Sequence, residues 1–206
     1  MTSALPALPD DCLVTRLSEG SLITRVHHKD YPPVFFGPKP GEPPKNRFDA
    51  PAGEFGTLYA AHSLTGGFVE TILRRAARIV AQSFLDQRAW SVLRLKTDCD
   101  LALLHGEGLV YHGVTNDICA GDDYKPSQML ALAFFQKFPV RGIAYRARHN
   151  NDEICYAINE RQSAADLELI ETHRFADHPA RVDALLRLHG AARDRGMPIP
   201  PAGALP

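Results

Sequence analysis

The 206-residue sequence has no long hydrophobic run and no excess of charge of either sign. No stretch approaches the ~18 apolar residues of a membrane-spanning helix, and residues 1–11 lack the basic and apolar regions of a secretory signal. These absences predict a cytoplasmic protein without a membrane partner. The formal net charge of −1, from 23 basic and 24 acidic residues, gives no electrostatic footprint for direct nucleic-acid binding.

Metal and cofactor motifs are also missing. The four cysteines are far apart, which indicates free thiols in a reducing compartment, and neither they nor the nine histidines show zinc-ligand spacing. The sequence has no Gly-x-Gly-x-x-Gly after a strand, no P-loop and no Gly-x-Ser-x-Gly elbow. We therefore predict no metal site and no tightly bound cofactor, and the sequence gives no support for a Rossmann or P-loop nucleotide site and little for a serine hydrolase.

The length suits one domain with a single core. We expect a lead-in over residues 1–20 and a flexible Pro/Gly/Ala-rich tail over 191–206. Hydrophobic periodicity predicts a mixture of strands and helices between them. The expected strands are 21–26, 58–61, 90–96, 142–145, 154–158 and 167–175, and residues 98–104 continue the sheet or turn. The expected helices are 64–80, a helix that follows Asp122-Asp123 and ends at Phe138, and 179–188.

Seven of the 16 prolines fall between Pro32 and Pro51, which predicts a long, stiff loop without regular structure. Ordered loops of this length in compact domains are often functional. Arg47 lies near the end of this loop, Tyr59 lies in the following strand, and Glu70 lies in the next helix beside its apolar stripe. A carboxylate near an apolar face needs a cation, hydrogen-bond donors or a ligand.

Each of these residues also has an ordinary structural interpretation. Arg25, near the end of the first expected strand, would form a surface ion pair, and Tyr59 would be part of the core. Asp122 and Asp123 could suggest a metal pair, but capping of the following helix explains both. A functional interpretation is favoured when Arg25, Arg47, Tyr59 and Glu70 are considered together.

Five segments, in this order, resemble the motifs of the RES-domain family. They are Thr24-Arg25-Val26, Asn46-Arg47-Phe48-Asp49, Leu58-Tyr59-Ala60-Ala61, Phe68-Val69-Glu70-Thr71 and Gly142-Ile-Ala-Tyr-Arg-Ala-Arg-His. The resemblance spans residues 21–160 and assigns 21–190 to a RES domain. It implies an α+β fold with an ADP-ribosyltransferase-like core of mixed and antiparallel sheets and flanking helices.

The resemblance also implies an activity, because members of this family are mostly toxins of bacterial toxin–antitoxin pairs that destroy NAD. Carried over by motif, Glu70, Arg47 and Tyr59 are the candidate catalytic residues. Arg25, Arg47, Phe48, Tyr59 and Arg148 are the candidate residues that bind NAD, with Tyr59 offering a ring face to nicotinamide. The family serine falls on Ala147, so Arg148, His149 or Asn150 would have to supply its hydrogen-bond donor.

The chemistry of the residues agrees with the implied activity. A carboxylate such as Glu70 can stabilise the oxocarbenium-like state formed when the nicotinamide–ribose bond breaks, and guanidinium groups match a pyrophosphate. We therefore expect NAD as the substrate, water or phosphate as the acceptor and a cognate antitoxin as the protein partner. Transfer of ADP-ribose to a protein and a non-catalytic NAD- or antitoxin-binding module remain the alternatives. The oligomeric state, including a homo-oligomer, stays open.

Overall fold

The computed structural model describes residues 6–39, 41–74 and 78–194, which contain one large sheet and one small one. The large sheet has eight strands in the order β1-β6-β7-β8-β3-β2-β5-β9. Their bounds are Val14–Leu17 for β1, Leu22–His28 for β2, Thr57–Ala61 for β3, Arg88–Leu95 for β5, Cys99–Leu104 for β6, Gly142–Ala147 for β7, Asn150–Asn159 for β8 and Leu167–Arg174 for β9. Strands β4 (Ile79–Ala81) and β10 (Ala192–Asp194) form the small sheet.

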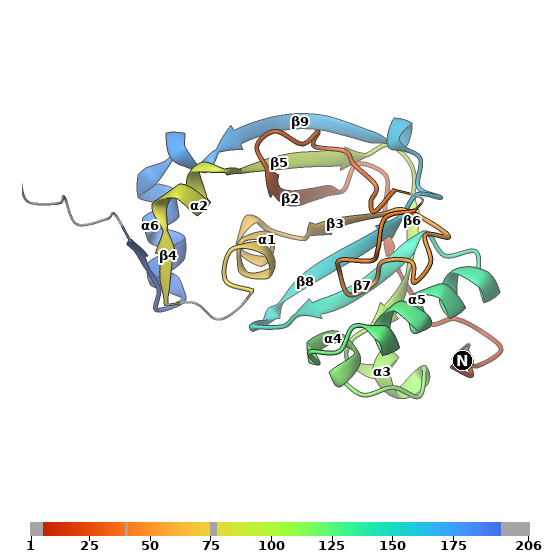
Figure 1. Ribbon diagram of the computed structural model, residues 1–206. Helices are drawn as coiled ribbons and strands as arrows, with labels where there is room; N and C mark the ends of the chain where they lie inside the picture. Colours follow the sequence, from red (N-terminus) through yellow and green to blue (C-terminus); the bar gives the residue numbers. More distant parts are fainter. Residues whose placement is uncertain (1–5, 40, 75–77, 195–206) are drawn as a thin grey trace, which may run out of the picture.

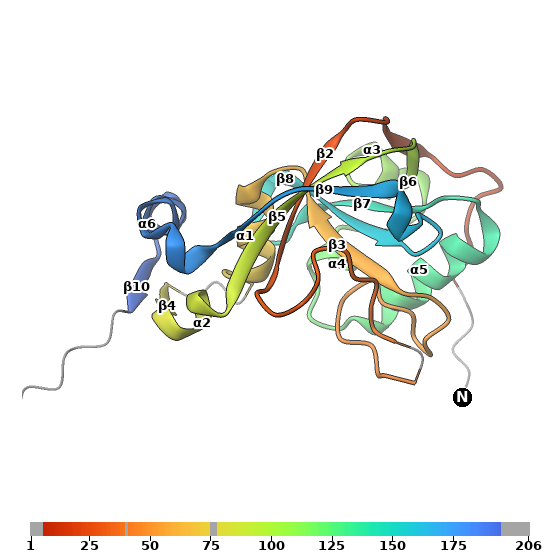
Figure 2. The ribbon, with the colours of Figure 1, turned by 90° about the horizontal axis from the view of Figure 1, so that it is seen from above.

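The large sheet divides into two parts between β3 and β2. All neighbours are antiparallel except β6 and β7, which are parallel, and most pairs share four or more residue positions. Strands β2 and β3 share only the pair Thr24 and Ala61. Figure 1 shows β2, β5 and β9 above and β3, β8 and β7 below, and from above β5 and β3 run in crossing directions (Figure 2). Because the ladder is interrupted here, a cleft can open between the two parts.

Six helices and two 3₁₀ turns flank the sheet. They are α1 (Leu64–Thr71), α2 (Gln82–Asp86), α3 (Glu107–Tyr111), α4 (Asp117–Ala120), α5 (Lys125–Lys137), α6 (Pro179–Leu188), η1 (Ala164–Asp166) and η2 (Phe175–Asp177). Helices α3, α4 and α5 lie on the side of the sheet where β6 and β7 are, whereas α2 and α6 lie with the small sheet at the opposite end (Figure 1). Proline in the first turn of α5 and of α6 has no N–H to lose there, so it suits a helix start.

Helix α1 lies at the open end of the two sheet parts (Figure 1). It begins because the Ser63 side chain accepts a hydrogen bond from the Gly66 N–H at 3.1 Å, while the Ser63 hydroxyl donates to Glu153. Gly67 lets the helix approach β2 closely, since a Cβ there would lie 3.1 Å from Val26 Cγ2. Glu70 lies one turn further along the same helix.

Three apolar clusters hold these layers together. The first packs α5 and the loop before β3 against β7 and β8, around Phe48, Phe134 and Tyr145. The second joins the two sheet parts through residues such as Ile23, Leu58 and Leu93. The third packs α1 against β5 and α6 and contains Phe68, Trp90 and Val182.

The expected α+β fold is confirmed, with differences at several elements. Residues 14–17 of the expected lead-in form β1, which pairs with β6, and residues 192–194 of the expected tail form β10, which pairs with β4. The predicted helix 64–80 is wrong beyond Thr71, because residues 79–81 form β4; residues 75–77, and 195–206 of the tail, lie outside the described residues. The link between β7 and β8 is only two residues, 148 and 149, not eight.

Candidate functional site

The cleft between the two sheet parts has a volume of about 940 Å³, at the upper end of the range for small-molecule sites. It is lined by residues of β2, the proline-rich loop, β3, α1, β7 and the turn after β7. The structure brings together five of the six residues singled out in the sequence. These are Arg25, Arg47, Tyr59, Glu70 and Arg148.

Glu70 presents its carboxylate to this cleft from the last turn of α1. Its Oε1 accepts a hydrogen bond of 2.7 Å from the backbone N–H of Arg148, in the β7–β8 turn. No other hydrogen bond to this carboxylate comes from the described residues. A backbone donor thus fixes one oxygen, and the second oxygen is available to a ligand.

Arg25 is a buried cation on β2. Its side chain is 9 % exposed, and its Nη1 donates to the Phe35 carbonyl at 2.8 Å. Burial lowers the pKa of Arg25 to about 10, so the group remains charged at neutral pH. No carboxylate among the described residues pairs with it, and a buried cation in this state favours an anionic ligand.

Arg47 is held by the aromatic ring of Tyr124, which precedes α5. The guanidinium carbon lies 4.6 Å from the ring centroid, and the residue is 7 % exposed. Its Nη1 lies 3.4 Å from the Ile118 carbonyl oxygen, a long hydrogen bond. Stacking on the ring leaves most of the guanidinium donors available and sets the plane of the fork.

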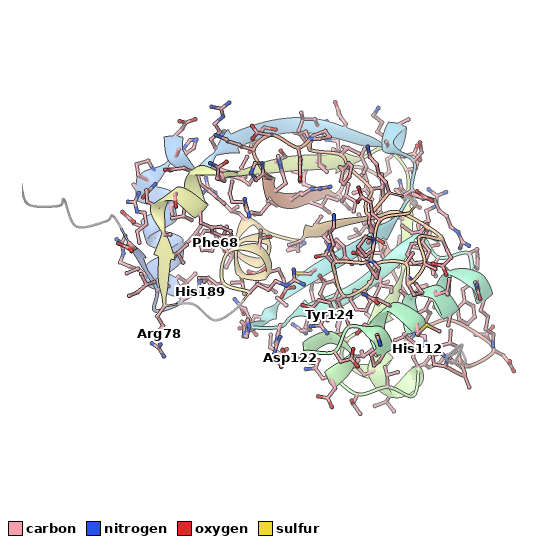
Figure 3. All side chains as sticks on the ribbon, in the orientation of Figure 1. Phe68, Arg78, His112, Asp122, Tyr124 and His189 are labelled. Atoms are coloured by element: carbon pink, nitrogen blue, oxygen red, sulfur yellow. The ribbon has the colours of Figure 1, made fainter. Side chains whose placement is uncertain are left out.

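Tyr124 carries a second guanidinium, that of Arg74. Arg74 Cζ lies 5.3 Å from the ring centroid, its Nη2 donates to the phenol oxygen at 2.6 Å, and its Nη1 donates to Asn46 at 3.2 Å. The interactions with Tyr124 and Glu70 raise the pKa of Arg74 against the effect of its burial. Figure 3 shows Tyr124 on the side of the molecule where α4 lies, with Asp122 beside it. The ring therefore joins the loop, the segment after α1 and the start of α5.

Tyr59 lines the cleft, but its hydroxyl group forms hydrogen bonds within the protein. It donates to Asp49 Oδ1 at 2.9 Å and accepts from the Phe48 N–H at 2.9 Å. Burial, followed by the nearby Asp49 carboxylate, raises the pKa of Tyr59 well above its usual value. The phenol stays protonated at neutral pH, so this tyrosine offers a surface to a ligand and does not exchange protons with it.

Asp49 organises the loop that carries Arg47. It is fully buried, and its Oδ2 accepts hydrogen bonds from the N–H groups of Lys45 and Asn46 at 2.8 and 2.7 Å. Together with the bond from Tyr59, these contacts tie the proline-rich loop to β3. The conformation of the loop around Arg47 is therefore set by a buried carboxylate.

Phe48 is placed differently from the other candidates. It is fully buried in the core, where its ring packs edge-on against Tyr145 with centroids 4.9 Å apart, and it does not line the cleft. The interpretation of Phe48 as a residue that contacts NAD is corrected to a packing role, with its N–H positioning Tyr59. Ala147 is likewise 1 % exposed and belongs to the same apolar cluster.

The structure also shows how the Arg148 segment meets the cleft. The donor to Glu70 is the Arg148 backbone, while its guanidinium pairs with Asp122 at 2.8 Å. This ion pair lowers the pKa of Asp122. The expected capping of α5 by both aspartates is wrong for Asp122. Asp123 accepts from the Lys125 N–H at 3.0 Å, but the N-cap residue is Tyr124, without a side-chain hydrogen bond of its own to the helix. Among the described residues, no group of histidine, cysteine or acidic side chains could hold a metal ion.

Sequence reasoning missed four residues of this arrangement: Arg74, Asp49, Tyr124 and Ser127. Ser127 is fully buried on α5, and its hydroxyl donates at 2.6 Å to the Ile118 carbonyl that also faces Arg47. The only signal for Asp49 was its place in the Asn-Arg-Phe-Asp segment. For Tyr124 and Ser127 the sequence carries no separate signal, because their partners are distant in the chain.

The cleft carries more positively than negatively charged side chains. Its lining contains seven lysine or arginine residues and three acidic residues, although the whole chain is nearly neutral. Two of these cations, Arg25 and Arg47, are nine-tenths buried. This excess of positive charge favours an anionic ligand.

Comparison with known proteins agrees with this geometry. Residues 22–181 match the family model described as the RES domain. The chain belongs to the RES-domain family. A comparison with curated proteins found no match.

Among solved structures, the RES-domain chain is similar to a chain in the crystal structure of the M. tuberculosis MbcT–MbcA toxin–antitoxin complex. The TM-score is 0.63 at 18 % sequence identity, and the match covers 80 % of this chain and 90 % of the other. At this identity the likeness establishes a shared fold. The RES match begins at β2 and ends in α6, so it contains every cleft residue described above. No helix of the described residues is long and apolar enough to cross a membrane.

Proposed function

We propose that this RES-domain protein binds NAD and cleaves the bond between nicotinamide and ribose. The observation that carries the proposal is the Glu70 carboxylate, fixed by the Arg148 N–H, in a cleft that otherwise carries an excess of cations. NAD combines an anionic pyrophosphate with a cationic nicotinamide ring, so it suits a site with both kinds of charge. The family match and the RES-like fold support the same substrate.

Glu70 would act at the nicotinamide ribose. As the glycosidic bond lengthens, positive charge develops on the ribose, and a preorganised carboxylate stabilises it. Nicotinamide leaves as a neutral molecule from a cationic ring, so the reaction does not need a second carboxyl group as a general acid. The raised pKa of Tyr59 makes its hydroxyl a poor proton donor, which agrees with a reaction that needs no general acid.

Arg25 and Arg47 would bind the pyrophosphate. Both are buried, both keep donors free of carboxylates among the described residues, and each has a fixed orientation: Arg25 through the Phe35 carbonyl and Arg47 through the Tyr124 ring. A guanidinium fork matches phosphate oxygens in pairs, which a lysine cannot do. These contacts would hold the ribose over Glu70.

Incubation of the purified protein with NAD, with and without phosphate, tests the proposal. We expect release of nicotinamide together with ADP-ribose if water is the acceptor, or with a phosphorylated ADP-ribose if phosphate is the acceptor. The Glu70→Gln variant is the matched control, since an amide still accepts from the Arg148 N–H but carries no charge. A wild-type protein that releases no nicotinamide would exclude the proposed activity.

Labelled NAD separates cleavage from transfer to a protein. Label that stays in the small-molecule fraction agrees with the hydrolase or phosphorylase activity, whereas label on protein indicates ADP-ribosyl transfer. Binding of NAD without either product would indicate a non-catalytic module. Each result assigns the cleft to a different class of function.

We further propose that the protein acts as a toxin and is neutralised by a cognate antitoxin. The support is the RES family together with the similar fold in a toxin–antitoxin complex. Expression of the chain should stop growth and lower cellular NAD, and co-expression of the neighbouring gene should restore both. Growth arrest that is unchanged in the Glu70→Gln variant would contradict toxicity through NAD.

A further inference from the structure

The mouth of the cleft beyond Arg25 is lined by aromatic side chains that the proposed chemistry does not use. The loop after β2 carries Tyr31 and Phe35, and His28 is the last residue of β2; all three line the cleft. Tyr31 is 59 % exposed. A large ring left this exposed at the entrance to a charged cleft is available for a ligand.

These three rings form a continuous surface. The Tyr31 and Phe35 rings are nearly parallel, at 29°, with centroids 6.1 Å apart, and the His28 ring lies 5.3 Å from that of Tyr31. Phe35 is held in place twice: its carbonyl accepts from Arg25, and its ring lies over Gly37, where a Cβ would come within 2.5 Å of Phe35 Cε1. These three rings are called the aromatic platform below. Through Phe35 the platform is linked to Arg25, which is proposed to bind a phosphate.

The aromatic rings and the Glu70 carboxylate are attached to different segments around the cleft. Glu70 interacts electrostatically with Arg74 and Tyr145 and is bonded to the turn after β7. Arg25 interacts with His27 and is bonded to the loop after β2. Because Arg25 is bonded to Phe35, and the Phe35 ring lies beside that of Tyr31, a ligand whose pyrophosphate lies at Arg25 can reach these rings, while Glu70 lines the same cleft from α1.

We propose that His28, Tyr31 and Phe35 form the subsite for the adenine base, which fixes the direction in which NAD lies in the cleft. This inference rests on the proposed function. A purine has a flat π-face that stacks on aromatic side chains without needing a unique set of hydrogen bonds. The nicotinamide ring, which carries a positive charge, is directed to Glu70, and the neutral purine is directed to the platform.

The test compares NAD with nicotinamide mononucleotide, which has the scissile bond and one phosphate but no adenine. In Tyr31→Ala we expect KM for NAD to rise about 10-fold, the scale of one base–aromatic stack (~1.4 kcal/mol). KM for the mononucleotide and kcat for both should stay within twofold. Tyr31→Phe should restore the wild-type KM for NAD, since the ring is what the adenine contacts.

Tyr111→Ala is the matched control, because Tyr111 is also an exposed tyrosine, at 44 %, but lies on α3 and does not line the cleft. It should leave both KM values unchanged. A parallel rise in KM for both substrates in Tyr31→Ala, or no rise for either, would overturn the adenine subsite.

Binding of AMP by calorimetry tests the platform independently of catalysis. We expect AMP to bind the wild type and to bind Tyr31→Ala about 10-fold more weakly. Equal AMP affinity in the two proteins, or no AMP binding by the wild type, would overturn the inference even if NAD is cleaved. Weaker AMP binding in a protein that releases no nicotinamide would support the subsite while excluding the proposed activity.

Discussion

The two parts of the large sheet contribute different kinds of groups to the cleft. The part formed by β1, β6, β7, β8 and β3 supplies Tyr59 and the backbone donor of Arg148, both fixed by paired strands and a two-residue turn. The part formed by β2, β5 and β9 supplies Arg25 and the aromatic loop after β2. Its outer strand, β9, is largely exposed.

This difference suggests a division of roles. The Arg148 N–H, which fixes the carboxylate proposed to act in bond cleavage, lies in the turn after β7 on the first part, where strand pairing holds it. The groups proposed to bind the substrate come from the other part and from the proline-rich loop. We therefore expect changes on the first side to lower turnover, and changes on the second to weaken binding.

The largest effect should come from Glu70→Gln. The amide retains the shape and the hydrogen bond from the Arg148 N–H, so the fold and the affinity for ADP-ribose should change little. The rate of nicotinamide release should fall by about 10²-fold or more, because one preorganised charge at the reacting centre is lost. Turnover near that of the wild type would remove Glu70 from the mechanism.

The next effect should come from replacing either clamp arginine by lysine. Arg25→Lys and Arg47→Lys keep the charge but lose the fork, and each should weaken ADP-ribose binding by about 10-fold or more without weakening nicotinamide binding. Arg94→Lys, on the exposed face of β5, is the control. Unchanged ADP-ribose affinity in both variants, measured by calorimetry, would exclude the clamp and with it the division between the two sides.

A smaller effect should distinguish the two functions of Tyr124. Tyr124→Leu removes the ring beneath Arg47 and Arg74 and should weaken ADP-ribose binding by about 3- to 10-fold, the scale of one cation–π contact. Tyr124→Phe keeps the ring, loses only the hydrogen bond from Arg74, and should lie closer to the wild type. Equal losses in the two variants would show that the hydrogen bond from Arg74, and not the ring beneath Arg47, accounts for the effect.

The smallest effect should come from Ala147→Ser. The family resemblance implied that a hydroxyl at this position would hold the substrate, but the Ala147 methyl is buried in the core and does not line the cleft. Nicotinamide release should therefore change by less than about twofold. The free energy of unfolding should fall by about 1 kcal/mol if the added hydroxyl lacks a partner. A clear gain in cleavage would show that this position reaches the substrate after all.

The local sequence was sufficient for most strands and for the order of the functional residues. Alternation of apolar residues predicted β2, β5 and β9, and the prolines predicted an irregular loop, because both signals depend on neighbours in the chain. The same reasoning extended α1 too far. The apolar residues after Thr71 continue the helical pattern. However, Val80 lies in β4, and its side chain is buried because this strand pairs with β10, over a hundred residues away in the chain.

The sequence by itself thus determined the residue types available for the proposed NAD chemistry, the family and the α+β class. Tertiary structure decided how these residues are used. The interruption between β2 and β3 opens the cleft, the two-residue β7–β8 turn brings a backbone N–H to Glu70, and Tyr124 supports two arginines from other elements. It also separated Phe48, which faces the core, from Arg47, which faces the cleft. Such contacts join residues far apart in the chain, so they depend on packing that no local pattern encodes.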